Sequence, residues 1–247
     1  ISIWATSTMR NGGEDIGQIL SLLGMKPIWE YSTQRVLSLE IIPLSILDRP
    51  RVDILIRISG LFRDSFPQVV ALINNAQVKL SQLDEPSELN PYINSNSNLG
   101  RQSRIFGSAP GSYGCGLQEL ISSSNWENKK ELADSYIKWS KWKYTGESNP
   151  ISNNEEFIYH LSKVQAVIHN QDNKEHDILD SDDYYQFHGG LAASIEEYSG
   201  SKPMILIGDH SRSQRPRINS LKKEIDKVIR NRLLNPKWIE GIKKHGY

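Results

Sequence analysis

Cysteine is nearly missing from this sequence, and its scarcity limits the sites that the chain can build. Cys115 stands alone among 247 residues, so an internal disulfide and a zinc or iron–sulfur site with several cysteine ligands are excluded. Long apolar runs are missing too, although a membrane helix needs about 20 consecutive apolar residues. The start shows no signal-peptide pattern. We therefore expect a cytoplasmic protein without a membrane span.

An excess of charge of one sign is also lacking. Lys and Arg number 29, Asp and Glu number 29, and the formal net charge is +0. No overall field draws the chain to nucleic acid, which is not expected as a partner. The motif Gly-x-x-x-x-Gly-Lys-Ser/Thr does not occur, so we do not expect this chain to hydrolyse ATP. The length suits one or two domains, and the start at Ile1 suggests a piece of a longer protein.

What is present is an alternation of strand-like and helix-like segments. Residues 51–59 are mostly apolar and β-branched, which predicts a buried strand. Residues 65–83 repeat apolar positions at spacings of three and four, which predicts an amphipathic helix. Two further pairs follow the same order, residues 164–168 with 191–198 and residues 203–207 with 221–234. The alternation predicts an α/β fold with a mostly parallel sheet flanked by helices.

The middle of the chain has a different texture and is expected to form a helical insertion. Residues 90–98 are rich in Asn and Ser and predict an exposed loop, and residues 125–144 predict a helix with Trp139 in the core. Asn235 and Pro236 mark the start of one more helix, as N-cap and first helical position. We divide the chain into a first α/β part (1–89), the insertion (90–150) and a second α/β part (151–247).

Charged side chains follow each of the three predicted strands. Arg63 and Asp64 come after the first strand, residues 169–177 after the second and residues 208–212 after the third. Helix capping explains about one Asp or Ser at each strand end, and these loops hold many more ionisable groups. Because the carboxyl ends of parallel strands open into one crevice, the sequence predicts a shared functional site there.

Residues 172–188 form the most ionisable segment, with six carboxylates and two imidazoles. The mixture suits a divalent cation, and imidazole favours cobalt, nickel or zinc over magnesium. Glu175 and His176 could also accept protons. The alternative is a solvated acidic loop in which Asp180 or Ser181 caps the next helix. The spacing matches neither His-Glu-x-x-His nor an EF-hand loop, so it does not decide between the two.

Residues 107–116 contain four glycines and a proline. Such a loop exposes backbone N–H groups and could hold the carboxylates or amides of a large planar ligand. A tight turn before a helix near Leu117 is the simpler alternative. Cys115 has no assignable histidine partner and is expected to be a small packing residue.

Six stretches of the sequence resemble the large subunit of aerobic-type cobaltochelatase and, more distantly, that of magnesium chelatase. They are residues 51–64 (RVDILIRISGLFRD), 104–114 (RIFGSAPGSYG), 170–177 (NQDNKEHD), 180–190 (DSDDYYQFHGG), 208–212 (GDHSR) and 235–247 (NPKWIEGIKKHGY). They keep their order and extend over nearly the whole chain. The resemblance therefore does not depend on a single short motif.

The resemblance implies a ligase that inserts cobalt into a corrin precursor of vitamin B12, hydrogenobyrinic acid a,c-diamide. The chain would be a C-terminal segment of a much longer tetrapyrrole-binding subunit, inactive alone, while an AAA+ motor subunit and its adaptor subunit hydrolyse ATP. Magnesium chelatase, which acts on protoporphyrin IX, is the nearest alternative; residues 175–177 and 209–211 favour the cobalt branch. A non-catalytic scaffold segment that docks the motor subunits is a further alternative.

Within this frame, residue type and position suggest roles for individual side chains. The predicted metal ligands are Glu175, His176, Asp209 and His210. The predicted catalytic residues, which would accept protons where cobalt meets the corrin ring, are Asp172, Glu175 and His176. The predicted substrate-binding residues are Arg63, Asp64, Ser112, Tyr113 and Arg212, with both arginines facing carboxylates of the ligand.

Overall fold

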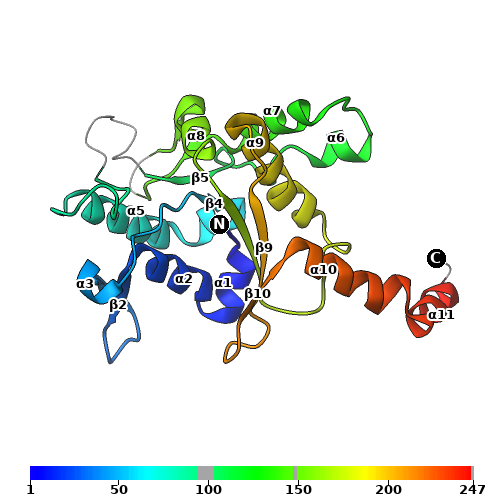
Figure 1. The fold of residues 1–247 in the computed structure, drawn as a ribbon, viewed down its shortest axis with the longest axis horizontal. Helices are drawn as coiled ribbons and strands as arrows, with labels where there is room; N and C mark the ends of the chain where they lie inside the picture. Colours follow the sequence, from blue (N-terminus) through cyan, green and yellow to red (C-terminus); the bar gives the residue numbers. More distant parts are fainter. Residues whose placement is uncertain (94–102, 147–148, 246–247) are drawn as a thin grey trace.

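A computed structural model describes residues 1–93, 103–146 and 149–245 of the chain. Two mixed sheets and a separate hairpin are surrounded by helices (Figure 1). The predicted α/β fold class is confirmed. Residues 94–98 of the predicted exposed loop lie outside the described residues.

The first sheet has the strand order β1-β4-β5-β6-β7, with parallel pairing from β1 through β5 and antiparallel pairing beyond. Its strands are β1 (Ser2–Ile3), β4 (Ile56–Ile58), β5 (Ile105–Gly107), β6 (Trp142–Lys143) and β7 (Ile151–Ser152). In the second sheet β8 and β9 are parallel and β10 is antiparallel at the edge. Its strands are β8 (Ala166–Gln171), β9 (Met204–Asp209) and β10 (Arg217–Ser220). The hairpin consists of β2 (Met25–Trp29) and β3 (Val36–Ile41).

Helices connect these strands. In the first part of the chain they are α1 (Ala5–Asn11), α2 (Glu14–Leu23), α3 (Leu44–Leu47), α4 (Gly60–Ser65) and α5 (Pro67–Ser81). The middle part contains α6 (Gln118–Ser122), α7 (Lys129–Ser140) and α8 (Asn154–Leu161). The last part contains the π-helical turn η1 (Tyr184–Gly189), α9 (Gly190–Ser199), α10 (Leu221–Val228), the π-helical turn η2 (Ile229–Leu233) and α11 (Pro236–Lys244).

The predicted strand over residues 51–59 is shorter in the structure and belongs to a different sheet from the two later strands. Only β4 pairs, and in place of strand pairing Arg51 turns its guanidinium inward to the carbonyl oxygens of Leu23 and Gly24 and to Glu85. The second and third predicted strands become β8 and β9 of the second sheet. The three charged strand ends therefore do not share one sheet.

The helix predictions agree better with the structure. The predicted helix over residues 65–83 is α5, and Asn235 caps α11 by accepting a hydrogen bond from the N–H of Lys237 at 3.1 Å. The helix expected over residues 125–144 ends early, because α7 stops at Ser140 and β6 follows at once. Asn90, expected in an exposed loop, is buried, and its amide donates to Leu80 O and Glu85.

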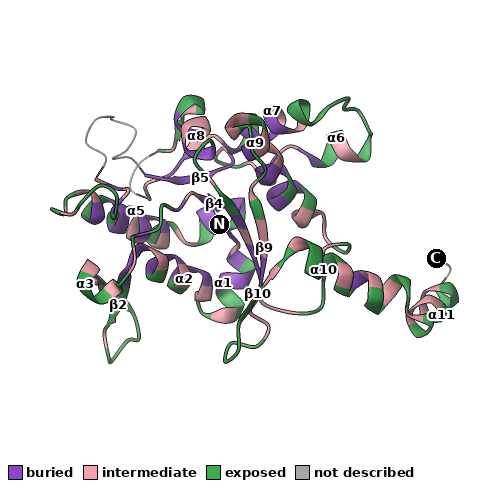
Figure 2. Cartoon of the chain, viewed as in Figure 1, coloured by how far each residue is buried: buried purple, intermediate pink, exposed green. Residues whose placement is uncertain are grey.

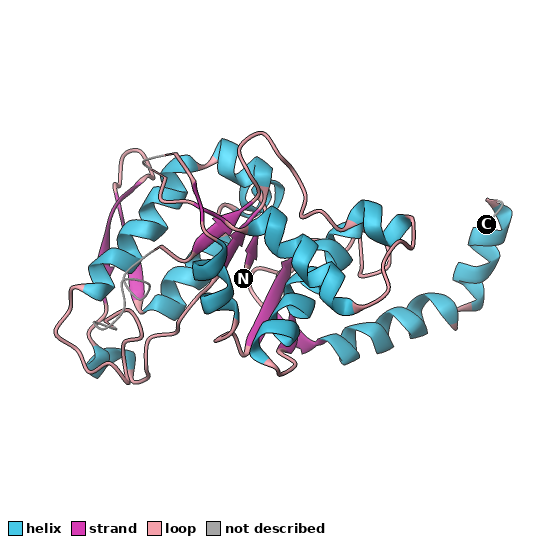
Figure 3. Ribbon diagram, turned by 90° about the horizontal axis from the view of Figure 1, so that it is seen from above, coloured by secondary structure: helices cyan, strands magenta, loops and turns pink. Residues whose placement is uncertain are grey.

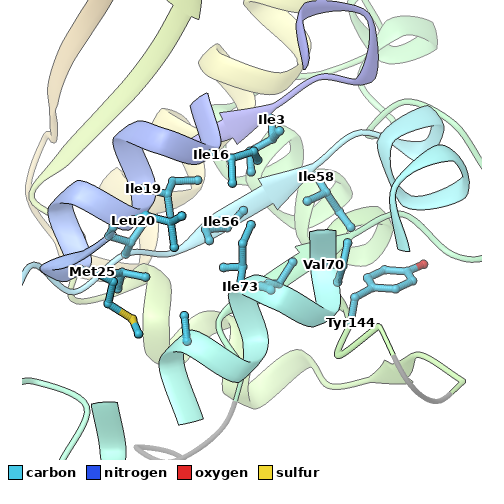
Figure 4. Close-up of a cluster of buried hydrophobic side chains, with 14 of the residues drawn as sticks. Ile3, Ile16, Ile19, Leu20, Met25, Ile56, Ile58, Val70, Ile73 and Tyr144 are labelled. Carbon is cyan, nitrogen blue, oxygen red and sulfur yellow. The ribbon is translucent and has the colours of Figure 1, made fainter. Parts of the chain in front are cut away.

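Two hydrophobic cores lie on opposite faces of the first sheet. Successive strand residues point to opposite faces; Ile105 joins the first core, and Phe106 joins the second. Figure 4 shows the first core, where Ile3 and Ile56 pack with Ile19 of α2 and neighbouring apolar side chains. Each fully buried aliphatic side chain of this kind contributes about 1.5–3 kcal/mol to folding. The buried residues are concentrated around the sheets in Figure 2.

The last helices form an arm that extends away from the sheets. α10, η2 and α11 follow one another outward in both views (Figures 1 and 3). α11 has no buried residue, and Leu233 and Leu234 at the joint are largely exposed. Among the described residues, no helix is both long and apolar enough to cross a membrane.

Candidate functional site

Two adjoining hollows open where strands of both sheets end. A large cavity of about 970 Å³ is bordered by segments that follow β1, β4 and β5, and a small hollow of about 340 Å³ by the segment that follows β8. Four residues border both, and we call them the shared wall: Trp4, Thr6, Asp182 and Asp183. The end of β1 was not predicted as part of a site. Strand ends of both sheets therefore meet around one connected region.

The floor of the large cavity depends on a close approach between α4 and the glycine-rich loop. Ser59 caps α4 by accepting from the N–H of Phe62. A Cβ atom at Gly60 would lie 2.7 Å from a ring carbon of Tyr113 and 2.9 Å from Ser112 O. Since real Cβ contacts are not that short, only glycine at position 60 allows the glycine-rich loop to approach α4 this closely.

Arg63 holds the glycine-rich loop from inside. Its guanidinium donates to Ala109 O at 2.6 Å, to Ser112 O at 3.1 Å and, with two nitrogens, to Asp64. The two hydrogen bonds from Arg63 to Asp64 lower the pKa of the Asp64 carboxyl. The Tyr113 hydroxyl also donates to Asp64 at 2.8 Å. Arg63 is thus engaged with the protein itself, and Tyr113, with 60% of its surface exposed, is the predicted substrate-binding residue that borders the cavity.

Another part of the wall of the large cavity is aromatic and polar. Trp139, which we expected in the core, borders the cavity and packs against Gly116, where a Cβ atom would lie 2.2 Å from the indole. Gln186 also borders it and is fixed by Asp182 at 2.7 Å. Cys115 lies behind this wall, and burial raises the pKa of its thiol to about 12. The cysteine is therefore a packing residue, as predicted.

The small hollow contains the predicted catalytic residues. Arg10 of α1 clamps Asp172 with two hydrogen bonds of 2.8 and 2.9 Å. Burial opposes ionisation of Asp172, but the bonds from Arg10 outweigh it, so its pKa lies below the ordinary value. Glu175 and His176 border the same hollow and are exposed at its rim. The structure brings Asp172, Glu175 and His176 to one hollow.

Asp209 and His210 lie beside this hollow without bordering it. The backbone N–H of His210 donates to Gln171 O at 2.8 Å, and the side chain of Gln171 donates to His176 O. The His210 ring faces Glu14 of α2 at 3.4 Å. Asp209 accepts from the backbone N–H and the hydroxyl of Ser211. Both predicted histidines are therefore hydrogen-bonded to Gln171 through their backbone, His210 to its carbonyl oxygen and His176 to its side-chain amide.

The predicted metal ligands do not gather around one point. Within residues 1–93, 103–146 and 149–245, no group of three or more His, Cys, Asp or Glu side chains is placed to hold a metal ion. Arg212 is exposed in the segment after β9 and borders neither hollow. The metal and substrate assignments stay predictions.

Sequence reasoning did not foresee a buried group of rings at the small hollow. His169 of β8 stacks on His188 of η1, with ring centroids 5.4 Å apart, and lies 4.7 Å from the ring of Tyr184. Burial lowers the pKa of His169 to about 3 and that of His188 to about 4, so both are neutral at neutral pH. Both histidines belong to the ionisable segments 169–177 and 172–188, but nothing in the sequence indicated that their rings would stack.

An α/β fold whose polar strand ends surround a large concave site is typical of proteins that bind a sizeable ligand. The family is more specific: the chain belongs to the CobN/magnesium chelatase family, whose model matches residues 1–247.

Relatives extend over the whole chain. The aerobic cobaltochelatase subunit CobN of Pseudomonas aeruginosa is 45% identical over 264 residues, covering 100% of this chain and 21% of the relative. The solved catalytic subunit of cobaltochelatase from Mycobacterium tuberculosis has a TM-score of 0.94 at 37% identity and covers 100% of this chain and 22% of that protein. A magnesium-chelatase subunit of Cereibacter sphaeroides is 29% identical over 99% of this chain and 21% of its own length. The chain therefore spans about a fifth of these relatives.

Proposed function

We propose that this chain forms part of the tetrapyrrole- and metal-binding subunit of a cobaltochelatase, a ligase that inserts cobalt into a corrin precursor of vitamin B12. The observation that carries the proposal is the large cavity, which lies where strand ends of both sheets meet and adjoins a hollow rich in carboxylate and imidazole groups. Its volume of about 970 Å³ suits a large ligand, and Tyr113 and Trp139 offer aromatic surface to a planar ring.

In this proposal the ring occupies the large cavity and cobalt arrives through the small hollow. Glu175 and His176 stand at the rim of that hollow and Asp172 stands within it, where carboxylate oxygen and imidazole nitrogen suit a borderline divalent metal. Asp209 and His210 remain proposed ligands beside the hollow. Arg212, which is exposed, remains the proposed partner for carboxylates at the edge of the substrate.

Cobalt and the corrin are favoured over magnesium and protoporphyrin IX for two reasons. Imidazole prefers cobalt to magnesium, and the relatives with the higher identity carry the cobaltochelatase name. The finer proposal is that the substrate is hydrogenobyrinic acid a,c-diamide, that an AAA+ motor subunit and its adaptor hydrolyse ATP, and that the complex works in the cytoplasm. We expect the chain alone to be inactive.

The deciding experiment offers the full-length subunit, with its motor and adaptor subunits and ATP, two substrate pairs. One pair is the corrin diamide with Co²⁺ and the other is protoporphyrin IX with Mg²⁺. We expect absorbance changes of metal insertion with the corrin pair alone. Turnover of only the porphyrin pair would assign the chain to the magnesium branch. Glu175→Gln and His176→Ala should each slow cobalt insertion by about 10²-fold if their side chains act on the metal or the proton.

The arm supports a second candidate function, a scaffold that docks motor subunits. Leu234 is 68% exposed and Leu233 is 53% exposed on a segment that extends away from the sheets. Leu233→Asp with Leu234→Asp in the full-length subunit should weaken binding to the motor subunits and leave tetrapyrrole affinity unchanged. Lys222→Asp, on an exposed residue of α10, is the control for added charge. Unchanged motor binding in the leucine variant would show that the arm is not part of the docking surface.

A further inference from the structure

The shared wall holds two neighbouring carboxylates to which the proposed function assigns no role. Asp182 and Asp183 each border both the large cavity and the small hollow. Asp182 is fixed by Gln186, whose amide donates to it at 2.7 Å. Burial raises the pKa of Asp183, and the charge of Asp182 adds to that rise. Asp183 thus stands between the two spaces with a greater readiness to take up a proton than an ordinary carboxylate.

His169 is a second, independent indication that something passes through the small hollow. Only 6% of its surface is exposed, it borders the hollow, and its Nδ1 atom has no hydrogen-bond partner in the described part of the chain. A buried polar atom without a partner costs about 1–3 kcal/mol. That cost is recovered when the atom gains a hydrogen-bond partner.

We propose that Asp183 accepts the proton that leaves the tetrapyrrole during metal insertion, and that His169 passes it on through the small hollow. The inference rests on the proposed function, because it assigns a step of that same reaction to residues of the shared wall. Asp183 borders the cavity proposed for the ring, and His169 borders only the hollow beyond it. The proposal therefore places Asp183 next to the ring and His169 one step further from it.

The step balances without any redox partner. The corrin ring carries one inner N–H. That bond breaks heterolytically, its electron pair stays on nitrogen and binds the divalent metal, and its proton moves to a carboxylate oxygen of Asp183. The neutral carboxylic acid then gives its proton up toward His169 and becomes a carboxylate again before the next turnover. One proton leaves for each metal ion that enters, and no atom changes its oxidation state. Glu175 and His176 at the exposed rim connect the hollow with solvent.

Other titratable groups border the same two spaces as Asp183. Asp182 favours its protonated form and His176 favours its carboxylate form. The small hollow adds Arg10 from α1, with Asp172, Glu175, Asp180 and Tyr184 from the segment after β8, and the large cavity adds Tyr113 and Glu119. Since Asp183 must be ionised to accept a proton, the insertion rate should fall as the pH falls through its raised pKa.

Asp183→Asn in the full-length subunit tests the inference, because the amide has the same shape but cannot take up the proton. Tetrapyrrole affinity is measured by fluorescence quenching, and cobalt insertion with the partner subunits is measured across pH. We expect affinity within about twofold of wild type, an insertion rate lower by about 10²-fold or more, and loss of the acidic limb. His169→Gln should slow insertion less and keep that limb. Asp84→Asn, at an exposed carboxylate that borders neither hollow, is the matched control.

The outcomes separate this inference from the proposed function. If the wild-type subunit fails to bind the tetrapyrrole, the proposed function fails and the inference falls with it. If wild type binds while Asp183→Asn inserts cobalt at the rate and with the pH profile of Asp84→Asn, the inference alone is wrong. If Asp183→Asn loses affinity in proportion to rate, Asp183 is a binding residue and the proton route is refuted.

Discussion

At the scale of single residues, buried arginines organise this protein. Arg57 is only 1% exposed, donates to Ser140 Oγ at 3.1 Å and to Gly114 O at 3.2 Å, and lies over the ring of Phe187. Its position between two core isoleucines indicated a strand. Its partners could not be predicted, because they come from distant segments that meet only after the chain has folded. The same holds for Arg63, which sequence reasoning assigned to the substrate.

Arg63→Ala should destabilise the chain by about 3 kcal/mol, since it removes a buried guanidinium and leaves several loop carbonyls without a donor. Arg63→Lys should retain only part of this stability, because an ammonium group cannot reach all the acceptors that the guanidinium reaches. Urea unfolding of the 247-residue chain measures both. Unchanged stability together with weaker tetrapyrrole binding would instead support the sequence-based role as a ligand of substrate carboxylates.

His160 should make the fold sensitive to acid. Burial lowers its pKa to about 3, from an ordinary value of 6.5, and the nearby cations Arg104, Lys163 and Lys143 add to the effect. Glu156 lies 4.0 Å away but is already paired with Lys143 at 2.9 Å, so it does not reverse the shift. The unfolded chain takes up the proton first as pH falls below about 6.5, and stability is lost down to about pH 3.

The change in unfolding free energy between pH 7 and pH 5 tests this contribution of His160. His160→Gln cannot take up the proton, so wild type should lose about 2 kcal/mol more than the variant over this interval. Urea titrations at the two pH values give the difference. An equal loss in both proteins would show that His160 is not buried in its neutral form.

At the scale of elements, periodicity predicted long helices and failed on short strands. The apolar repeat located α5, and the Asn-Pro signature located α11. β1 has two residues, too few for any alternation to show. β4 has three and lies inside the longer strand predicted over residues 51–59. No element was predicted in residues 1–50, where α2 and the β2–β3 hairpin also lie. The division at residues 89 and 150 is not tested by these elements and stays a prediction.

α11 should depend on its cap more than any packed helix does, because none of its residues is buried. Asn235→Ala removes the hydrogen bond to the N–H of Lys237 and should cost this helix about 1 kcal/mol. Faster hydrogen exchange confined to the arm, with global stability unchanged, is the expected result. Glu240→Ala in the exposed middle of the helix is the control and should change little. Slower refolding of the whole chain, or a lower midpoint of its unfolding transition, would contradict the prediction that the arm is independent of the rest of the fold.

At the scale of the whole molecule, the site is made where the two sheets meet. The strand-end rule directed attention to the segments after β4 and β8, which border the two hollows. It could not show that these strands belong to separate sheets, or that Trp4 would stand between them. The segment after β9 was expected in the same crevice, yet Asp209, His210 and Arg212 border neither hollow.

Trp4→Ala should weaken the junction between the sheets. The indole ring lies 4.4 Å from the ring of Phe187 and 6.1 Å from that of His169, so its loss leaves a void beside the second core. A decrease of about 3 kcal/mol in unfolding free energy is expected. Trp126→Ala, at a half-exposed position outside both hollows, should cost much less. Similar losses for the two variants would mean that Trp4 does not join the sheets.

The shared wall also has a thermodynamic consequence. A ligand in the large cavity that displaces Trp4 or Asp183 changes the shape of the small hollow. A ligand in the small hollow affects the large cavity through the same side chains. Binding in the two compartments is then linked, and reciprocity requires each occupant to alter the affinity of the other by an equal factor. The dissociation constant of an ion bound beside His176 should therefore change when a macrocycle occupies the large cavity.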